Sequence, residues 1–108
     1  MFGFLKKDNN NVIPVNDIDN LIGKIELIDI REPYEYQAGS LKTAKNIPMR
    51  NLLNTPEKYL IMDKTYYIMC QSGARSGNTT KVLAKQGYHV INVAGGFGSY
   101  AGTKRNRG

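Results

Sequence analysis

The sequence contains a single cysteine, Cys70, and a single histidine, His89. One cysteine rules out a disulfide within the chain, and no Cys/His group has the spacing of a zinc site. The sequence therefore predicts neither a metal nor another cofactor. It also favours a reducing compartment, in which the thiol stays available.

Long apolar runs are also missing. The apolar stretch at 2–5 is too short for the core of a signal peptide, and Lys6 and Lys7 follow it instead of preceding it. No segment approaches the roughly 20 apolar residues of a membrane-spanning helix. We expect a cytoplasmic protein with no membrane partner.

The length of 108 residues and the mass of 12.1 kDa fit one domain and leave no room for a second core. We expect a polar leader over 1–11, a folded domain over 12–102, and a disordered basic tail over 103–108.

The formal net charge is +6 at pH 7, but the positive residues are not gathered on one predicted face. They cluster only near the two ends of the chain, at Lys6, Lys7, Lys104, Arg105 and Arg107. We therefore expect no nucleic-acid partner. The net positive charge favours small anionic substrates. Nothing in the sequence points beyond a monomer.

Short apolar segments alternate with helical patterns along the chain. Strands are predicted at 12–15, 25–29, 44–47, 65–69 and 89–93, and short helices at 16–22, 34–38, 50–53 and 56–61. A longer helix is predicted after Ser76, burying Val82, Leu83 and Thr79 and ending at Gly87. This alternation predicts an α/β domain with an open, largely parallel sheet flanked by helices on both faces. Ligands then bind beyond the carboxyl ends of the strands, where Asp29 and Cys70 both stand.

Cys70 ends the most apolar strand and opens a loop of small residues before a helix. Amides of such a loop and of the first helical turn converge on one point, where the helix dipole adds partial positive charge. A depression of the thiol pKa by about two units needs roughly 2.7 kcal/mol, which several amide donors can supply. A buried structural cysteine is the alternative, but Gly73, Arg75 and the strand–loop–helix setting favour a reactive thiolate close to solvent.

Several motifs, taken in order, resemble the single-domain rhodanese family of sulfurtransferases over about residues 12–100. They are Ile28-Asp29-Ile30-Arg31-Glu32, Tyr34-Glu35-Tyr36 with Gly39, Ala44-Lys45-Asn46-Ile47-Pro48, Cys70-Gln71-Ser72-Gly73-Ala74-Arg75-Ser76, and Gly87-Tyr88 followed by Gly95-Gly96. The resemblance implies a five-stranded parallel sheet with the cysteine loop as a cradle at its carboxyl edge. Two departures stand out: Ser40-Leu41-Lys42-Thr43-Ala44 replaces the usual His-Ile-x-Gly-Ala, and Tyr100 replaces a frequent tryptophan.

The implied reaction is a double displacement at Cys70. The thiolate takes the outer sulfur of a small anionic donor such as thiosulfate, and the persulfide passes it to cyanide or to a thiol. Backbone amides from Gln71 to Ser76 are predicted to stabilise the charged sulfur, with Gly73 permitting the turn and Ala74 completing the ring. Gln71, Ser72 and Ser76 are expected to offer neutral hydrogen bonds at the rim.

Three residues near the end of the strand at 25–29 are expected to support the loop: Asp29, Arg31 and Glu32. Arg75 either binds the donor's sulfonate or pairs with Asp29 or Glu32, and the structural pair is favoured. For Arg31 a structural salt link is favoured more strongly. His89 is expected to be a half-exposed strand residue and no catalytic base. Tyr34 and Tyr36 are weaker candidates for lining the approach to the site.

Two other functions remain open. A cysteine phosphatase or arsenate reductase also uses a thiolate in an amide cradle, but its loop typically has five residues between Cys and Arg, whereas this loop has four. A non-catalytic persulfide carrier or interaction module, fed by a sulfur-relay protein, needs the same cysteine. For that role the basic tail and the segment 40–42 are candidate partner surfaces.

Overall fold

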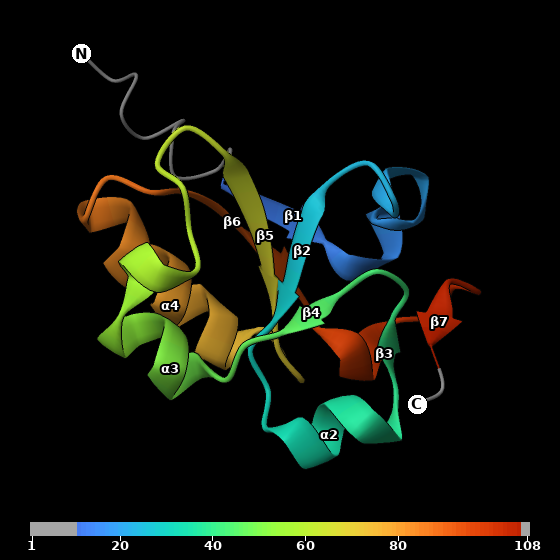
Figure 1. Cartoon of the computed structure of the whole chain (residues 1–108). Helices are drawn as coiled ribbons and strands as arrows, with labels where there is room; N and C mark the ends of the chain where they lie inside the picture. The colour runs from blue at the N-terminus through green and yellow to red at the C-terminus, as the bar shows by residue number, and fades with distance from the viewer. Residues whose placement is uncertain (1–10, 107–108) are drawn as a thin grey trace.

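The computed structural model describes residues 11–106. Five parallel strands form the central sheet in the order β1-β6-β5-β2-β4 (Figure 1). They are β1 (Val12–Pro14), β2 (Glu26–Asp29), β4 (Lys45–Asn46), β5 (Thr65–Met69) and β6 (His89–Ala94). The predicted α/β class and parallel sheet are confirmed. β1 lies at an edge, as expected for a strand whose Pro14 has no N–H to donate.

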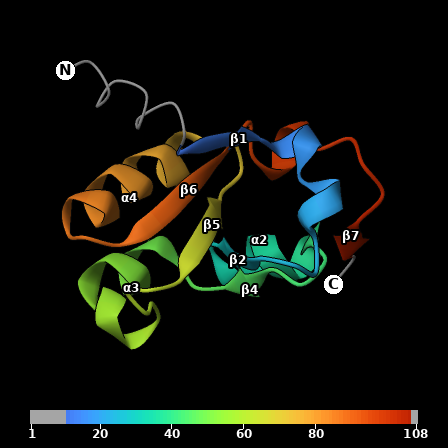
Figure 2. The same cartoon turned by 90° about the horizontal axis from the view of Figure 1, so that it is seen from above.

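Helical segments cover both faces of the sheet (Figures 1 and 2). One face carries α3 (Met49–Asn54), η3 (Pro56–Lys58) and α4 (Ala74–Lys85). The other carries the 3-10 turns η1 (Val15–Asp17), η2 (Asp19–Leu21) and η4 (Phe97–Ser99), so a single helix at 16–22 was a wrong prediction. α2 (Pro33–Ala38) lies beyond the carboxyl ends of the strands. None of the helices within residues 11–106 has the length and hydropathy that crossing a membrane requires.

Each face of the sheet has its own core. In β5, Tyr66 and Ile68 pack in the cluster beneath α3 and α4, whereas Met69 packs in the cluster on the opposite face. Ile68 and Met69 have no exposed surface, and burying a side chain of this size contributes about 1.5–3 kcal/mol. Burial on both faces explains why β5 reads as an unbroken apolar run.

Helix α4 differs from its prediction at its start and in its buried face. It begins at Ala74, because Gly73 takes a left-handed conformation (φ +99°) at the N-cap and turns the chain directly into the helix. The buried side is Ser76, Thr79, Thr80 and Leu83, a stripe at helical spacing. Val82 falls outside that stripe and is 42% exposed, so its predicted burial was wrong.

The C-terminal segment forms a strand instead of the expected disordered tail. β7 (Arg105–Asn106) pairs antiparallel with β3 (Ser40–Leu41), while residues 107–108 lie outside the described range. The guanidinium of Arg105 lies over the Phe97 ring at 5.2 Å and donates to the Tyr100 carbonyl at 2.7 Å. Ser40 and Leu41 are buried, so within the segment 40–42 only Lys42 is exposed to a partner. The predicted leader, apart from Asn11, also lies outside the described range.

Thr43 is the only non-glycine residue with a positive φ (+68°) in the described part of the chain. It occupies the position where the family pattern has glycine, and a β-branched side chain is strained in this conformation. We expect Thr43→Gly to raise the free energy of unfolding by about 1 kcal/mol. Denaturant titration measures the change. Thr103→Gly, at another exposed threonine, is the control and is expected to give no gain; an equal gain there would contradict the assigned strain.

Candidate active site

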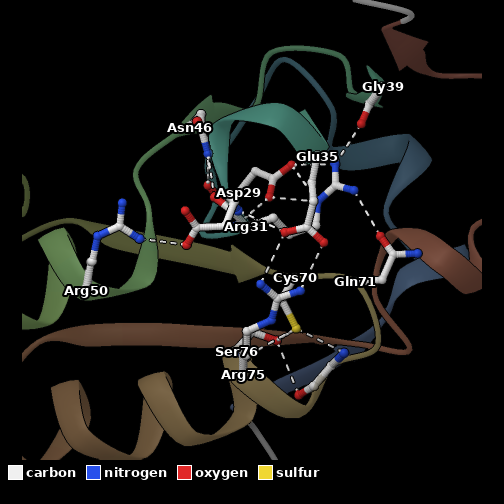
Figure 3. Close-up of polar contacts among 12 residues, drawn as sticks. Asp29, Arg31, Glu35, Gly39, Asn46, Arg50, Cys70, Gln71, Arg75 and Ser76 are labelled. Carbon is white, nitrogen blue, oxygen red and sulfur yellow. Dashed lines mark hydrogen bonds and ion pairs between the residues drawn. The ribbon is translucent and has the colours of Figure 1, made fainter. Parts of the chain in front are cut away.

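Cys70 and Asp29 lie at the same edge of the sheet, as the sequence predicted (Figure 3). β2 and β5 are neighbouring parallel strands, and the register pairs Asp29 with Met69, the residue before Cys70. Two chain segments that are about forty residues apart therefore bring their polar side chains to one place.

Three hydrogen-bonding groups surround the sulfur of Cys70. The amides of Gly73 and Ser76 donate to Sγ at 3.1 and 3.3 Å, and the Ser76 hydroxyl lies 3.3 Å from it. Burial alone would raise the pKa of Cys70, but hydrogen bonds from the Ser76 hydroxyl and from the amides of Ser76, Gly73 and Ser72 outweigh it. The pKa of the thiol is therefore lowered from its ordinary value. Of the amides predicted between Gln71 and Ser76, those of Gly73 and Ser76 donate to Sγ, whereas that of Ala74 donates to the Ser72 hydroxyl.

The sulfur is not close to solvent, contrary to the prediction. Cys70 has no exposed surface and belongs to the core cluster on the α3–α4 side of the sheet. A sulfur donor therefore reaches Sγ only after the loop or the side chains above it move.

Asn92 is a site residue that the sequence did not reveal. It lies on β6, and its Oδ1 is 2.5 Å from the hydroxyl of Ser76. Ser76 has a single hydroxyl proton, and Sγ, Asn92 and the Gly73 carbonyl at 3.3 Å are all within reach of it. Asn92 Oδ1 thus competes with the sulfur for the one proton of the Ser76 hydroxyl. The one available signal was an amide side chain in an otherwise apolar strand.

The turn at η4 holds the beginning of the cysteine loop through the backbone. The amide of Phe97 donates to the Cys70 carbonyl and that of Gly98 to the Gln71 carbonyl, both at 2.9 Å. Gly96 makes this approach feasible, because a Cβ at that position would lie 2.5 Å from the Cys70 carbonyl oxygen. The double glycine of the sequence motif therefore has a physical role in fixing the loop.

Arg31 is buried (3% exposed) and joins β2 to the cysteine loop. Its guanidinium donates to both carboxylate oxygens of Asp29 at 2.9–3.2 Å, and to the side-chain oxygen of Gln71 at 2.9 Å. Ser40 completes the group by donating to Asp29 at 2.7 Å. The structural salt link favoured for Arg31 is present. Gln71 is exposed, as expected for a residue at the rim, and its side-chain oxygen accepts from this arginine.

Arg75 pairs with Glu35, and the predicted partners Asp29 and Glu32 were wrong. Its two terminal nitrogens donate to the two Glu35 oxygens at 3.2 Å each (Figure 3). The hydrogen bond from Arg75 lowers the pKa of Glu35, and that contact with Glu35 raises the pKa of Arg75. Glu32 contacts the exposed Arg50 instead, at 2.7 Å. Sequence could not reveal Glu35 as the partner, because the pairing depends on where α2 docks.

The other candidates lie at the margin of the site or far from it. Ser72 is exposed, and its hydroxyl accepts from the Ala74 amide at 3.4 Å. Tyr34 is 73% exposed, while the Tyr36 hydroxyl donates to the Ala44 carbonyl at 2.8 Å and so anchors α2. His89 opens β6 at the end of the sheet opposite Cys70 and is exposed, so it is not placed to act as a base.

The hydroxyl of Ser76 contacts the sulfur, whereas that of Ser72 does not, which makes a matched pair of variants. We expect Ser76→Ala to raise the pKa of Cys70, because a hydrogen bond to the thiolate is lost. Ser72→Ala is expected to leave it within a few tenths of a unit. The pH dependence of the ultraviolet thiolate absorbance measures both values, and the single cysteine makes the signal unambiguous. Equal shifts in the two variants would contradict the role given to Ser76.

Comparison with known proteins agrees with this geometry. The family model of the rhodanese-like domain matches residues 15–103. Protein YqhL of Bacillus subtilis is 38% identical over 80 residues, which cover 73% of this chain but only 63% of YqhL, less than two thirds. A sulfurtransferase of Allochromatium vinosum is 37% identical over 76 residues, covering 69% of this chain and 70% of that protein. A rhodanese-like domain protein from Staphylococcus aureus shares the fold, with a TM-score of 0.79 at 24% identity over 91% of this chain and 98% of that structure. The chain, which carries the Cys70 loop at the carboxyl edge of its sheet, belongs to the rhodanese-like domain family.

Proposed function

We propose that this protein transfers a sulfane sulfur from a donor to an acceptor through a persulfide on Cys70. Membership of the rhodanese-like family and the sulfurtransferase relative support a sulfurtransferase-type function. The observation that carries the finer proposal is the set of donors on one sulfur: two amides and one hydroxyl. Such a set stabilises a negative charge that stays on sulfur throughout the reaction.

In the first step the Cys70 thiolate attacks the outer sulfur of the donor. With thiosulfate, a new S–S bond forms at Cys70, the S–S bond of the donor breaks, and sulfite leaves with the bonding electron pair. No proton moves, so the step needs no general base, and no histidine lies nearby. The amides that held the thiolate then lie beside the persulfide.

In the second step the acceptor attacks the outer sulfur of the persulfide. Cyanide takes up the sulfur and departs as thiocyanate, or an acceptor thiolate takes it up and departs as a new persulfide. Cys70 returns to the thiolate. The same hydrogen bonds from Gly73 and Ser76 stabilise the leaving thiolate. One cradle therefore serves both half-reactions.

Two alternatives remain from the sequence. A persulfide carrier is favoured by one observation, the complete burial of Cys70, because a partner protein that opens the loop would deliver or collect the sulfur. A phosphatase is disfavoured, since Arg75 is bound to Glu35 and the loop has one residue fewer than phosphatase loops. We extend the proposal to a cytoplasmic monomer acting on a small anionic donor, with a sulfur-relay protein as a further partner and neither nucleic acid nor a membrane involved.

Sulfur uptake tests the proposal directly. After incubation with thiosulfate, intact mass spectrometry is expected to show one added sulfur atom on the wild type, and cyanide is expected to remove it. Cys70→Ser, which keeps the volume of the side chain nearly unchanged, is expected to take up none. Sulfur uptake by this variant would rule out the mechanism. Uptake only from a protein persulfide would favour the carrier, and rapid turnover of a phosphate ester would favour the phosphatase.

A further inference from the structure

Three arginines near the cysteine loop are each paired with a carboxylate. Arg31 pairs with Asp29 at 2.9 Å, Arg75 with Glu35 at 3.2 Å, and Arg50 with Glu32 at 2.7 Å. The formal charges of these six side chains cancel. With Cys70 ionised, these seven side chains together carry one net negative charge, which is unfavourable for an anion of high charge.

Arg75 is the guanidinium best placed to receive an anionic donor, but Glu35 occupies it. Arg75 directly precedes Ser76, whose amide donates to Sγ at 3.3 Å, yet both terminal nitrogens of Arg75 already donate to Glu35. A sulfonate group needs the same pair of parallel N–H donors that a carboxylate uses. Thiosulfate therefore competes with Glu35 for this arginine.

Glu35 is held in place from its other side. Its Oε1 also accepts the backbone amide of Glu32 at 2.9 Å, and the Glu32 side chain in turn accepts from the Glu35 amide. This reciprocal capping box fixes the first turn of α2. Glu35 and Arg75 are also only 20% and 36% exposed, so their pairing is less screened by water than a fully exposed one. The Glu35 carboxylate is therefore held in a fixed position beside Arg75.

We propose that Glu35 makes the site selective for a persulfide donor over thiosulfate. This inference rests on the proposed function and names the donor class. A hydropersulfide, R–S–SH, is neutral or carries one negative charge, whereas thiosulfate carries two, so repulsion by Glu35 and the Cys70 thiolate weighs far less on the persulfide. A persulfide also has no sulfonate, and it leaves the Arg75–Glu35 pair intact.

The transfer from a persulfide balances without an added reagent. The Cys70 thiolate attacks the outer sulfur of R–S–SH, the new S–S bond forms at Cys70, and the S–S bond of the donor breaks. The products are Cys70–S–SH and the thiolate R–S⁻, which carries away the bonding pair. The transferred sulfur keeps its oxidation state.

Two carboxylates of α2 give a matched test. Glu35→Gln and Glu32→Gln remove the same charge from neighbouring positions, but only Glu35 contacts Arg75. Rates of sulfur loading on Cys70 are measured by mass spectrometry with thiosulfate and with the persulfide of 2-mercaptoethanol, over a range of donor concentrations. The readout is the ratio of the two second-order rate constants, which cancels any general change in the reactivity of Cys70.

In Glu35→Gln we expect the ratio of the thiosulfate rate constant to the persulfide rate constant to rise about tenfold. The gain is expected to come from tighter binding of thiosulfate, with the loading rate at saturating thiosulfate unchanged. In Glu32→Gln it is expected to change less than about twofold. Adding Arg75→Gln to Glu35→Gln is expected to abolish the gain, since no guanidinium is then freed. This double variant also shows that the gain comes from Arg75 and not from a loosened α2.

An unchanged ratio in Glu35→Gln would overturn the inference. So would an equal rise in Glu32→Gln, or a gain that survives the loss of Arg75. Should Glu35→Gln unfold, which circular dichroism reveals, Glu35→Asp shortens the reach to Arg75 while keeping the charge, and we expect a smaller rise in the same direction. Absence of sulfur uptake by the wild type from both donors is a different result, because it would overturn the proposed function itself.

Discussion

The hydrogen bonds donated to the sulfur of Cys70 are the interaction on which the rest of this site depends. A thiol buried without partners would have a raised pKa and would be inert. Here the amides of Gly73 and Ser76 and the Ser76 hydroxyl reverse the effect of burial. They can do so only because the chain turns at Gly73 and enters α4 immediately, which points the first amides of the helix at the sulfur.

The surrounding structure fixes the beginning of this loop. η4 binds the carbonyls of Cys70 and Gln71, and Arg31 binds the side chain of Gln71 from the other side. A buried ion pair such as Arg31–Asp29 is costly to desolvate, and its net contribution to stability is small unless every hydrogen bond is made. Here each partner is fully engaged, and no buried side-chain nitrogen or oxygen in the described part of the chain lacks a hydrogen bond. The pair therefore acts mainly to hold β2, the segment at Gly39 and the cysteine loop in one arrangement.

The fold was predictable from local patterns, because the buried strand β5 reads as an apolar run and the five predicted strands alternate with helical segments. The position of Asp29 beside Cys70 followed from the same reasoning. The contacts that could not be predicted from the sequence depend on how the helices and strands dock against one another. The pairing of Glu35 with Arg75 depends on where α2 rests, and the contact of Asn92 with Ser76 depends on the order of strands. The ordered strand at 105–106 required a partner, β3, that lies more than sixty residues earlier in the chain.

The closed loop and the lowered pKa together describe a thiolate that is stabilised before any donor arrives. Such preorganisation lets the site hold charge without rearranging solvent during the reaction, while access depends on movement of the loop or of the side chains above it.

The claim that the cradle stabilises a thiolate is tested most directly by a pH titration of the wild-type protein, in which NMR follows the Cβ carbon of Cys70. One cysteine gives one resonance, and its shift reports the charge on the sulfur. We expect a midpoint clearly below that of the same cysteine in the unfolded chain, in line with the lowered pKa. A midpoint at or above the unfolded value would contradict the claim that the cradle stabilises a thiolate.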